Sequence, residues 1–209
     1  MGIYVKGAFG AFSGKVGNLV GSNWRSIDYL RSRPRPSKKA ATELQLAQRE
    51  KLILVTDFLS PVRDLINIGL NDKGRNKSMA YNIAVMNLIK QLEGVYPNFT
   101  IPYSEVKFSK GDLSTITVET GTDMDGNFQV QWSPRLGHTA KLTDKVYLIF
   151  YKEEAEDFFV FQDCVRGDAE YSIAPKEMGT GTFQLWTFLF SEDGKKRSKS
   201  QYIGAFELD

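Results

Sequence analysis

The sequence predicts an α+β protein with a basic, glycine-rich N-terminal arm, a short helical segment and a C-terminal antiparallel β-sandwich. Three observations predict this class. Glycine and arginine are concentrated in the first 40 residues, apolar residues recur near a helical period between residues 42 and 92, and short alternating runs follow residue 104. The expected parts are therefore 1–40, 41–103 and 104–209.

Charge separates the first part from the rest of the chain. Residues 1–40 carry eight of the 27 basic residues and one of the 25 acidic residues, which leaves 19 basic and 24 acidic residues in the remainder. The arm is thus +7 and the remainder −5. Such an asymmetry favours contact between the arm and the body of another subunit, or binding of the arm to an external polyanion.

Five glycines in the arm follow a strict 3-4-3-4 spacing, at positions 7, 10, 14, 17 and 21. On a helix this spacing would align them on one face and permit close approach of another backbone. Each glycine costs a helix about 1 kcal/mol relative to alanine, so the extended or loop conformation is favoured for residues 1–24. Residues 25–40 are expected to form a polyproline-like or irregular linker, because Pro34 and Pro36 hold Arg33 and Arg35 in extended conformations.

Helices are expected after the arm. Thr42 is a candidate N-cap for a helix whose apolar stripe comprises Leu44, Ala47, Leu52, Val55, Phe58 and Leu59. Pro61 ends or kinks it, a short second helix follows, and a third helix runs from Ser78 to a stop at Gly94.

Seven candidate strands separated by turn residues predict the sandwich. They are 114–120, 127–133, 144–151, 157–163, 169–174, 182–191 and 200–208. Trp132 alternates with Phe128 and Val130, so its side chain is expected in the core.

The chain resembles an uncharacterised family of Bacteroidota proteins. Three stretches carry the resemblance: GAFGAFSGKVGNLVGSNWRSIDYLRSRPRP, TELQLAQREKLILVTDFLSPV and the closing KSQYIGAFEL. The family implies no activity and no functional residues. In strand count and in its early-strand Trp132, the C-terminal half is also similar to immunoglobulin and fibronectin-type-III sandwiches.

The residues that could support catalysis or metal binding do not form known motifs. Gly10 to Val16 has three residues between its glycines and a valine in place of the hydroxyl residue, so it is not a phosphate loop. His138, the single histidine, cannot form a histidine-based metal site, and Cys164 is expected to pack near a strand end. Residues 153–157 and 123–127 are acidic segments that are interpreted as turns.

The sequence sets few limits on the cellular compartment of the protein. A single cysteine excludes an intramolecular disulfide, and neither a signal peptide nor an apolar run of about 20 residues is recognisable. A cytoplasmic protein, or a virion component of phage origin, is expected.

These observations predict a non-enzymatic structural protein that forms a homo-oligomer or larger assembly, such as a phage-like particle, through its arm. No cofactor, catalytic or metal-binding residues are predicted. The candidate partner-binding residues are Gly7, Gly10, Gly14, Gly17, Gly21, Trp24, Arg25, Tyr29, Arg31, Arg33, Arg35, Lys38 and Lys39.

Two alternatives remain. The arm combines arginines with Trp24 and Tyr29, which suits nucleic-acid phosphates and bases. The acidic remainder, onto which the arm could dock, favours protein contact instead. The other alternative is that the sandwich is a carbohydrate- or protein-binding module that uses loops such as 134–143.

Overall fold

The chain folds as two compact units, Met1–Thr42 and Glu43–Asp209. The computed structural model describes residues 2–3, 13–24, 27–35, 39–70, 77–122, 127–134, 137 and 140–208. Helices and antiparallel strands occur together, which confirms the α+β class.

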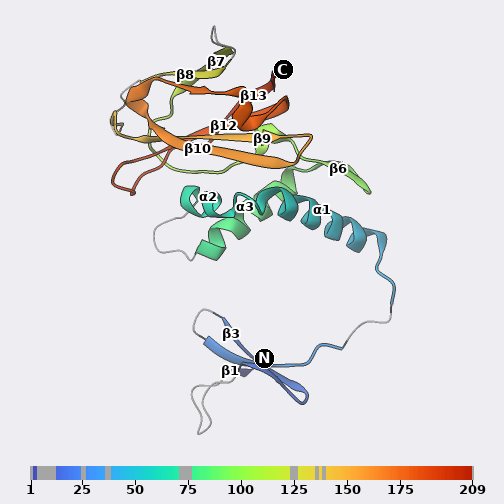
Figure 1. Cartoon of the computed structure of the whole chain (residues 1–209). Helices are drawn as coiled ribbons and strands as arrows, with labels where there is room; N and C mark the ends of the chain where they lie inside the picture. The colour runs from blue at the N-terminus through green and yellow to red at the C-terminus, as the bar shows by residue number, and fades with distance from the viewer. Residues whose placement is uncertain are drawn as a thin grey trace. The chain divides into compact units, whose positions relative to one another are not determined.

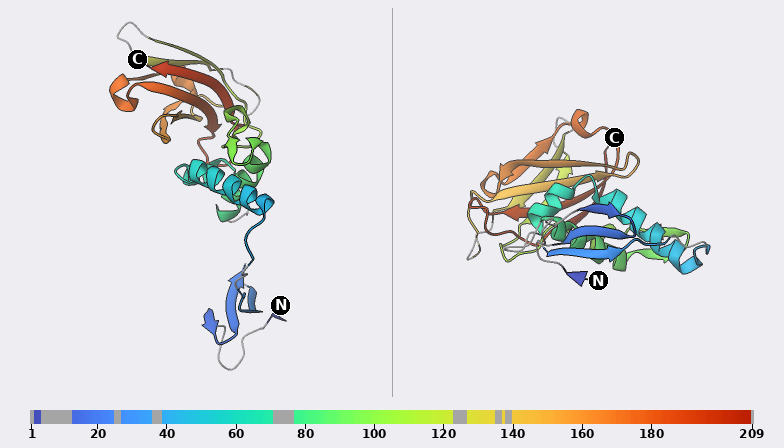
Figure 2. Two further views of the ribbon diagram at one scale, coloured as in Figure 1. Left: turned by 90° about the vertical axis from the view of Figure 1, so that its right-hand side faces the viewer. Right: turned by 90° about the horizontal axis from the view of Figure 1, so that it is seen from below.

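The N-terminal unit is an antiparallel sheet of four strands in the order β1-β4-β3-β2 (Figure 2). The strands are β1 (Gly2–Ile3), β2 (Gly14–Val16), β3 (Leu19–Trp24) and β4 (Ile27–Ser32). Two residues connect β2 to β3, and the first of them, Gly17, has a φ of +58°. A two-residue hairpin with glycine at this position matches the twist of the flanking strands.

The C-terminal unit begins with three helices and a small hairpin. The helices are α1 (Glu43–Leu59), α2 (Arg63–Gly69) and α3 (Lys77–Gln91), and the hairpin pairs β5 (Glu93–Val95) with β6 (Asn98–Thr100). A short 3₁₀ turn, η1 (Tyr103–Glu105), leads into the larger sheets.

Two further sheets complete this unit. The first has the order β10-β9-β12-β13 and comprises β9 (Lys145–Lys152), β10 (Asp157–Val165), β12 (Gly181–Phe190) and β13 (Gln201–Leu208). The second has the order β11-β8-β7 and comprises β7 (Thr117–Thr122), β8 (Phe128–Ser133) and β11 (Glu170–Ile173). The short η2 (Arg166–Asp168) and α4 (Pro175–Met178) lie between strands.

The sheet β10-β9-β12-β13 is the middle layer of three in the C-terminal unit. On one side it faces the helices, and on the other it faces the three-stranded sheet (Figure 1). In β9, Tyr147, Ile149 and Tyr151 belong to the core on the helical side. Val146, Leu148 and Phe150 belong to the core between the two sheets. The side chains on both faces of β9 are therefore buried.

The three expected helices and the seven strands expected after residue 104 correspond closely to those observed. All of them lie within a few residues of their expected positions. The six strands β1–β6 were not expected, and β4 lies within residues 25–40, where a linker was predicted, because its cross-strand pairing with β3 depends on register and not on local composition. Trp132 is 4 % exposed, as expected, and its Nε1 donates a hydrogen bond to the carbonyl of Arg166 at 3.0 Å.

Two details of the helical segment differ from expectation. Leu44 and Leu52 are 81 % and 47 % exposed, because the N-terminal part of α1 projects beyond the sheet (Figure 1). Gly94 does not end α3, which ends at Gln91. It lies in β5 with a φ of +92°, where an added Cβ would be 2.3 Å from the carbonyl oxygen of Asn98. The close approach of β6 therefore requires this glycine.

Truncation of Trp186 should strongly destabilise the C-terminal unit. Its side chain is fully buried, makes ring contacts with Phe108 and Tyr202, and donates from Nε1 to the carbonyl of Tyr103 at 3.0 Å. Trp186→Ala should lower the free energy of unfolding by about 3–5 kcal/mol in urea denaturation. The matched variant Trp24→Ala, in the other unit, should change the same transition by less than about 0.5 kcal/mol.

Candidate functional site

Strand register gives the N-terminal sheet two chemically different faces. Residues paired across an antiparallel ladder lie on the same face, and the faces alternate along each strand. The pairs Lys15↔Val20, Val20↔Arg31, Ser22↔Tyr29 and Trp24↔Ile27 therefore share a face. We call this the aromatic–basic face: Lys15, Val20, Ser22, Trp24, Ile27, Tyr29 and Arg31.

The exposed apolar residues and the basic residues of the aromatic–basic face lie at opposite ends. Trp24 and Ile27 form a row at one end, and Lys15, Val20 and Arg31 form a row at the other. The backbone N–H of Arg33 donates to the carbonyl of Asn18 at 2.8 Å, which extends the ladder beyond the basic row. Ser22 and Tyr29 lie between the two rows.

Large apolar side chains on this sheet are exposed. Trp24 is 59 % and Ile27 44 % exposed, and among the described residues of the unit only Val20 and Gly21 are buried. Lys15 and Arg31 are exposed as well. The surface therefore offers apolar, aromatic and cationic groups together, which is the composition of interface centres and of nucleic-acid stacking platforms.

The opposite face combines glycines with apolar residues, of which Val16 is 61 % and Leu19 47 % exposed. Gly14 pairs with Gly21, Gly21 with Leu30, and Val16 with Leu19. At its polar end, Asn23 Nδ2 donates to Asp28 Oδ1 at 2.8 Å. Residues 14–16 and 19–24 are thus extended, as predicted, and the glycine spacing does not form one face of a helix.

The expected partner-binding residues fall into three groups. Gly14, Gly17, Gly21, Trp24, Tyr29 and Arg31 belong to the hairpins of the sheet, and Arg33, Arg35 and Lys39 are exposed residues that follow it. Gly7, Gly10, Arg25 and Lys38 lie outside the described residues.

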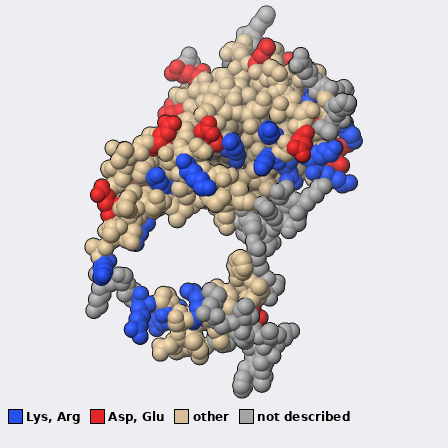
Figure 3. All heavy atoms as spheres, turned by 180° about the vertical axis from the view of Figure 1, so that it is seen from behind, with Lys and Arg blue, Asp and Glu red and all other residues tan. Residues whose placement is uncertain are grey.

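In the view of Figure 3, Lys and Arg predominate on the N-terminal unit, whereas both signs of charge are scattered over the C-terminal unit. Sequence reasoning missed Lys15, Val20 and Ile27 as parts of one face, because only the register brings them together.

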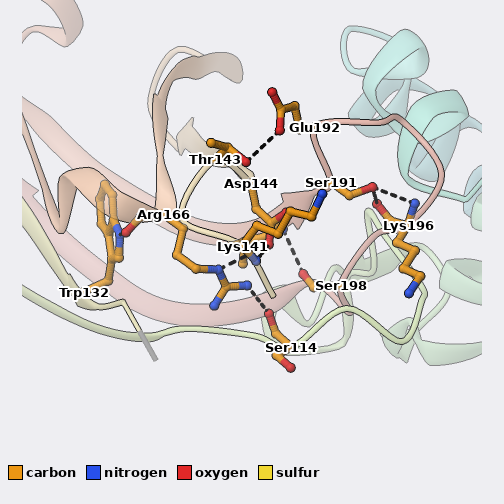
Figure 4. A network of polar contacts seen from close by, with 11 residues as sticks. Ser114, Trp132, Lys141, Thr143, Asp144, Arg166, Ser191, Glu192, Lys196 and Ser198 are labelled. Carbon is orange, nitrogen blue, oxygen red and sulfur yellow. Dashed lines mark hydrogen bonds and ion pairs between the residues drawn. The ribbon is translucent and has the colours of Figure 1, made fainter. Parts of the chain in front are cut away.

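A buried ion pair lies in the C-terminal unit (Figure 4). Arg166 Nε is 3.4 Å from Asp144 Oδ2, and both side chains are almost fully buried. Arg166 Nη2 also donates to the carbonyl of Ser114, and the backbone N–H of Lys141 donates to Asp144 Oδ2 at 2.8 Å. Burial lowers the pKa of Arg166, and Asp144 opposes that shift. Because these groups connect segments 114, 141–144 and 166, the pair holds loops together.

Cys164 is a core residue. Its side chain is 2 % exposed between the sheets, and Sγ donates to the carbonyl of Val146 at 3.5 Å. Burial, followed by the charge of Asp168, raises the pKa of the thiol to about 12. The thiol is therefore protonated at neutral pH, in keeping with the packing role expected for it. His138 lies outside the described residues.

The remaining polar features are modest. The acidic residues after β9 form the turn to β10, as expected, and Glu154 accepts a hydrogen bond from the backbone of Thr182 at 2.9 Å. The outer face of the three-stranded sheet has a shallow hollow of about 370 Å³, with Glu119, Gln131 and Glu170 around its edge. The described part of the chain contains no cluster of metal-ligating side chains.

None of the helices in the described residues is long and apolar enough to cross a membrane.

Comparison with known proteins identifies a family but no function. A family model described as a family of unknown function (DUF6266) matches residues 11–204. Neither the search of curated proteins nor the search of solved structures found a match. The similarity to immunoglobulin-like sandwiches therefore stays a prediction.

Removal of one partner of the buried ion pair should lower the free energy of unfolding more than replacement of both partners by apolar residues. Arg166→Met leaves the Asp144 carboxylate buried without its cation and should lower stability by about 3–5 kcal/mol. The double variant Arg166→Met/Asp144→Leu should recover a large part of this loss, as measured by urea denaturation. Thr143→Ala, which removes the exposed hydrogen bond to Glu192, serves as the control. Equal losses in the single and double variants would contradict this account.

Cys164 should make stability depend on alkaline pH. The thiol ionises near pH 9.0 when unfolded, and burial raises that pKa to about 12 in the folded protein. The stabilisation is complete below the unfolded pKa and is lost as pH rises through the folded pKa. Between about pH 8 and about pH 10.5, the wild type should therefore lose more stability than Cys164→Val in urea denaturation. Parallel losses would show that the thiol contributes nothing.

Proposed function

The chain belongs to this family of unknown function, DUF6266, and we propose that it is a non-enzymatic structural protein that self-assembles through its N-terminal sheet. An ordered, repetitive assembly such as a phage-like particle is the proposed setting. The observation that supports the proposal is the exposure of Trp24 and Ile27 on a 42-residue unit.

A unit of this size has few ways to become stable by itself. Domains near 40 residues generally require disulfides, metals or association with another chain. The single cysteine of the sequence, Cys164, lies in the other unit, and the described residues hold no metal-ligating cluster. Burial of its exposed apolar side chains against another surface is the remaining route, and we propose that another subunit provides that surface.

Nucleic-acid binding is the second candidate. The specific observation in its favour is that Trp24, Tyr29, Lys15 and Arg31 share one sheet face. Aromatic side chains on a sheet can stack with bases while cations contact phosphates. Assembly is preferred because Ile27, which is 44 % exposed, occupies the same face and suits an apolar partner better than a polyanion.

Removal of the N-terminal unit should abolish assembly. The full-length protein should elute as an oligomer in size-exclusion chromatography with light scattering, whereas a chain that starts at Ala41 should be monomeric. The C-terminal unit has its own cores, so the shorter chain should remain folded by circular dichroism.

An oligonucleotide titration of the same two proteins separates the candidates. Monomeric full-length protein that binds a single-stranded oligonucleotide in a salt-sensitive manner would replace assembly by the second candidate. If the full-length and shortened proteins have the same oligomeric state and neither binds the oligonucleotide, both candidates are removed.

A further inference from the structure

We propose that the C-terminal unit has a surface of its own that binds the phosphate backbone of double-stranded nucleic acid. The surface surrounds the loop between β12 and β13, so it is separate from the arm and independent of the proposed assembly function. Six cations form it, and we call them the basic loop surface: Lys110, Lys141, Lys195, Lys196, Arg197 and Lys199.

The loop between β12 and β13 has a high density of cations. Four of the five residues from Lys195 to Lys199 are basic, and Ser198 is the exception. Lys195, Lys196 and Lys199 are exposed, whereas Arg197 is half-buried. The loop therefore presents three lysine side chains to solvent.

Hydrogen bonds to the end of β12 hold the backbone of this loop. Ser198 is fully buried, its backbone N–H donates to the carbonyl of Leu189 at 2.9 Å, and its Oγ accepts from the N–H of Leu189 at 2.8 Å. The N–H of Ser191 donates to the carbonyl of Lys196 at 2.9 Å. Because the backbone is already ordered, binding of a ligand restricts mainly the lysine side chains.

A second segment brings another lysine to the loop. The backbone N–H of Leu113 donates to the carbonyl of Arg197 at 2.9 Å, and that of Ser200 donates to the carbonyl of Ser109 at 3.1 Å. Lys110 lies between the two bonded positions of its segment and is exposed. Its cation therefore adds to those of the loop.

Lys141 also lies near the loop (Figure 4). Hydrogen bonds from the side chain of Ser191 and the backbone of Lys195 lower the pKa of Asp193, and the charges of Lys195 and Lys141 lower it further. Lys141 is thus within Coulombic reach of the carboxylate that caps the loop, and its side chain is exposed.

The cations of this surface are not neutralised by neighbouring acids. Within the described part of the chain, Lys110, Lys195, Lys196 and Lys199 form no ion pair with a carboxylate. Residues 41–209 carry 19 basic and 24 acidic residues, so the surface is a local reversal of the sign of the unit's charge. An external polyanion would complement it.

The composition of the surface favours nucleic acid over a protein partner. Five of its six cations are lysines, and lysine is depleted at the centres of protein interfaces. The ring of Phe190 is half-buried, and Cζ of Arg197 lies 5.6 Å from its centre, so the ring is not placed to stack with a base. Lysine contacts to phosphates do not depend on base sequence and strengthen with phosphate density, which is higher in a duplex than in a single strand.

A fluorescence-anisotropy titration of the full-length protein with a DNA duplex of about 20 base pairs tests the surface. Lys195→Ala/Lys196→Ala/Lys199→Ala should weaken binding at least about tenfold at about 100 mM salt. It should also lower the slope of log affinity against log salt by about 2–3, because each phosphate contact contributes about 0.9. Lys110→Ala, in the neighbouring segment, should lower the slope by about 1.

The matched control removes three exposed cations from other parts of the same unit. Arg49, Lys90 and Lys176 lie on α1, α3 and α4. Arg49→Ala/Lys90→Ala/Lys176→Ala changes the net charge by the same amount and should leave the affinity within about twofold of the wild type, because these cations are outside the basic loop surface. Circular dichroism should show every variant folded, since each altered side chain is exposed.

The outcomes identify the surface and the partner. A loss confined to the basic loop variants, with the duplex bound more tightly than a single strand of the same length, supports the inference. Equal losses in the two triple variants, or no duplex binding by the full-length protein, overturn it. Tighter binding of the single strand overturns it in favour of stacking at the exposed Trp24 of the arm.

Stronger binding to vesicles of phosphatidylserine and phosphatidylcholine than to the duplex also overturns the inference, in favour of an anionic membrane surface. Assembly is measured separately on the same samples by size-exclusion chromatography with light scattering. The variants leave the N-terminal sheet unchanged, so their oligomeric state should equal that of the wild type whether or not they bind the duplex.

Discussion

The C-terminal unit depends on one constraint: its four-stranded sheet, β10-β9-β12-β13, is buried on both faces. Side chains alternate along β9 and β12, so that one set packs against the helices and the other set against the three-stranded sheet. Neither α1–α3 nor β7, β8 and β11 would have an apolar surface to cover without them. The three layers therefore form one unit, although the sequence suggests separate helical and sandwich parts.

The N-terminal unit is a compact unit with a sheet of its own. In the other unit the helices and sheets share two cores, although Leu44, Leu52 and Ile53 of α1 are exposed. The two units thus differ in their physical requirements. The C-terminal unit has two large cores of its own, whereas Trp24 and Ile27 of the N-terminal sheet are exposed. This difference is the basis of the proposal that the first 42 residues mediate assembly.

Polar groups inside the C-terminal unit have a connecting role. The Arg166–Asp144 pair and the hydrogen bond from Trp132 to the carbonyl of Arg166 join loops to the sandwich core. Such a pair contributes less to stability than its Coulomb attraction suggests, because both charges lose their hydration. It does fix which loops meet, since a displaced partner would leave a charge buried without compensation.

The sequence by itself determined the positions of α1–α3 and β7–β13, the charge of the arm and the burial of Trp132, because these depend on local periodicity and composition. The N-terminal sheet and the β5–β6 hairpin were not among its predictions. The sequence also could not determine which parity of β9 faces which layer, since a strand that is apolar on both sides has no alternation to interpret. Nor could it pair Arg166 with Asp144, which are distant in sequence, or gather Lys15, Trp24 and Arg31 on one face. Only the tertiary structure decided these matters, because strand register and the stacking of layers set which distant side chains become neighbours.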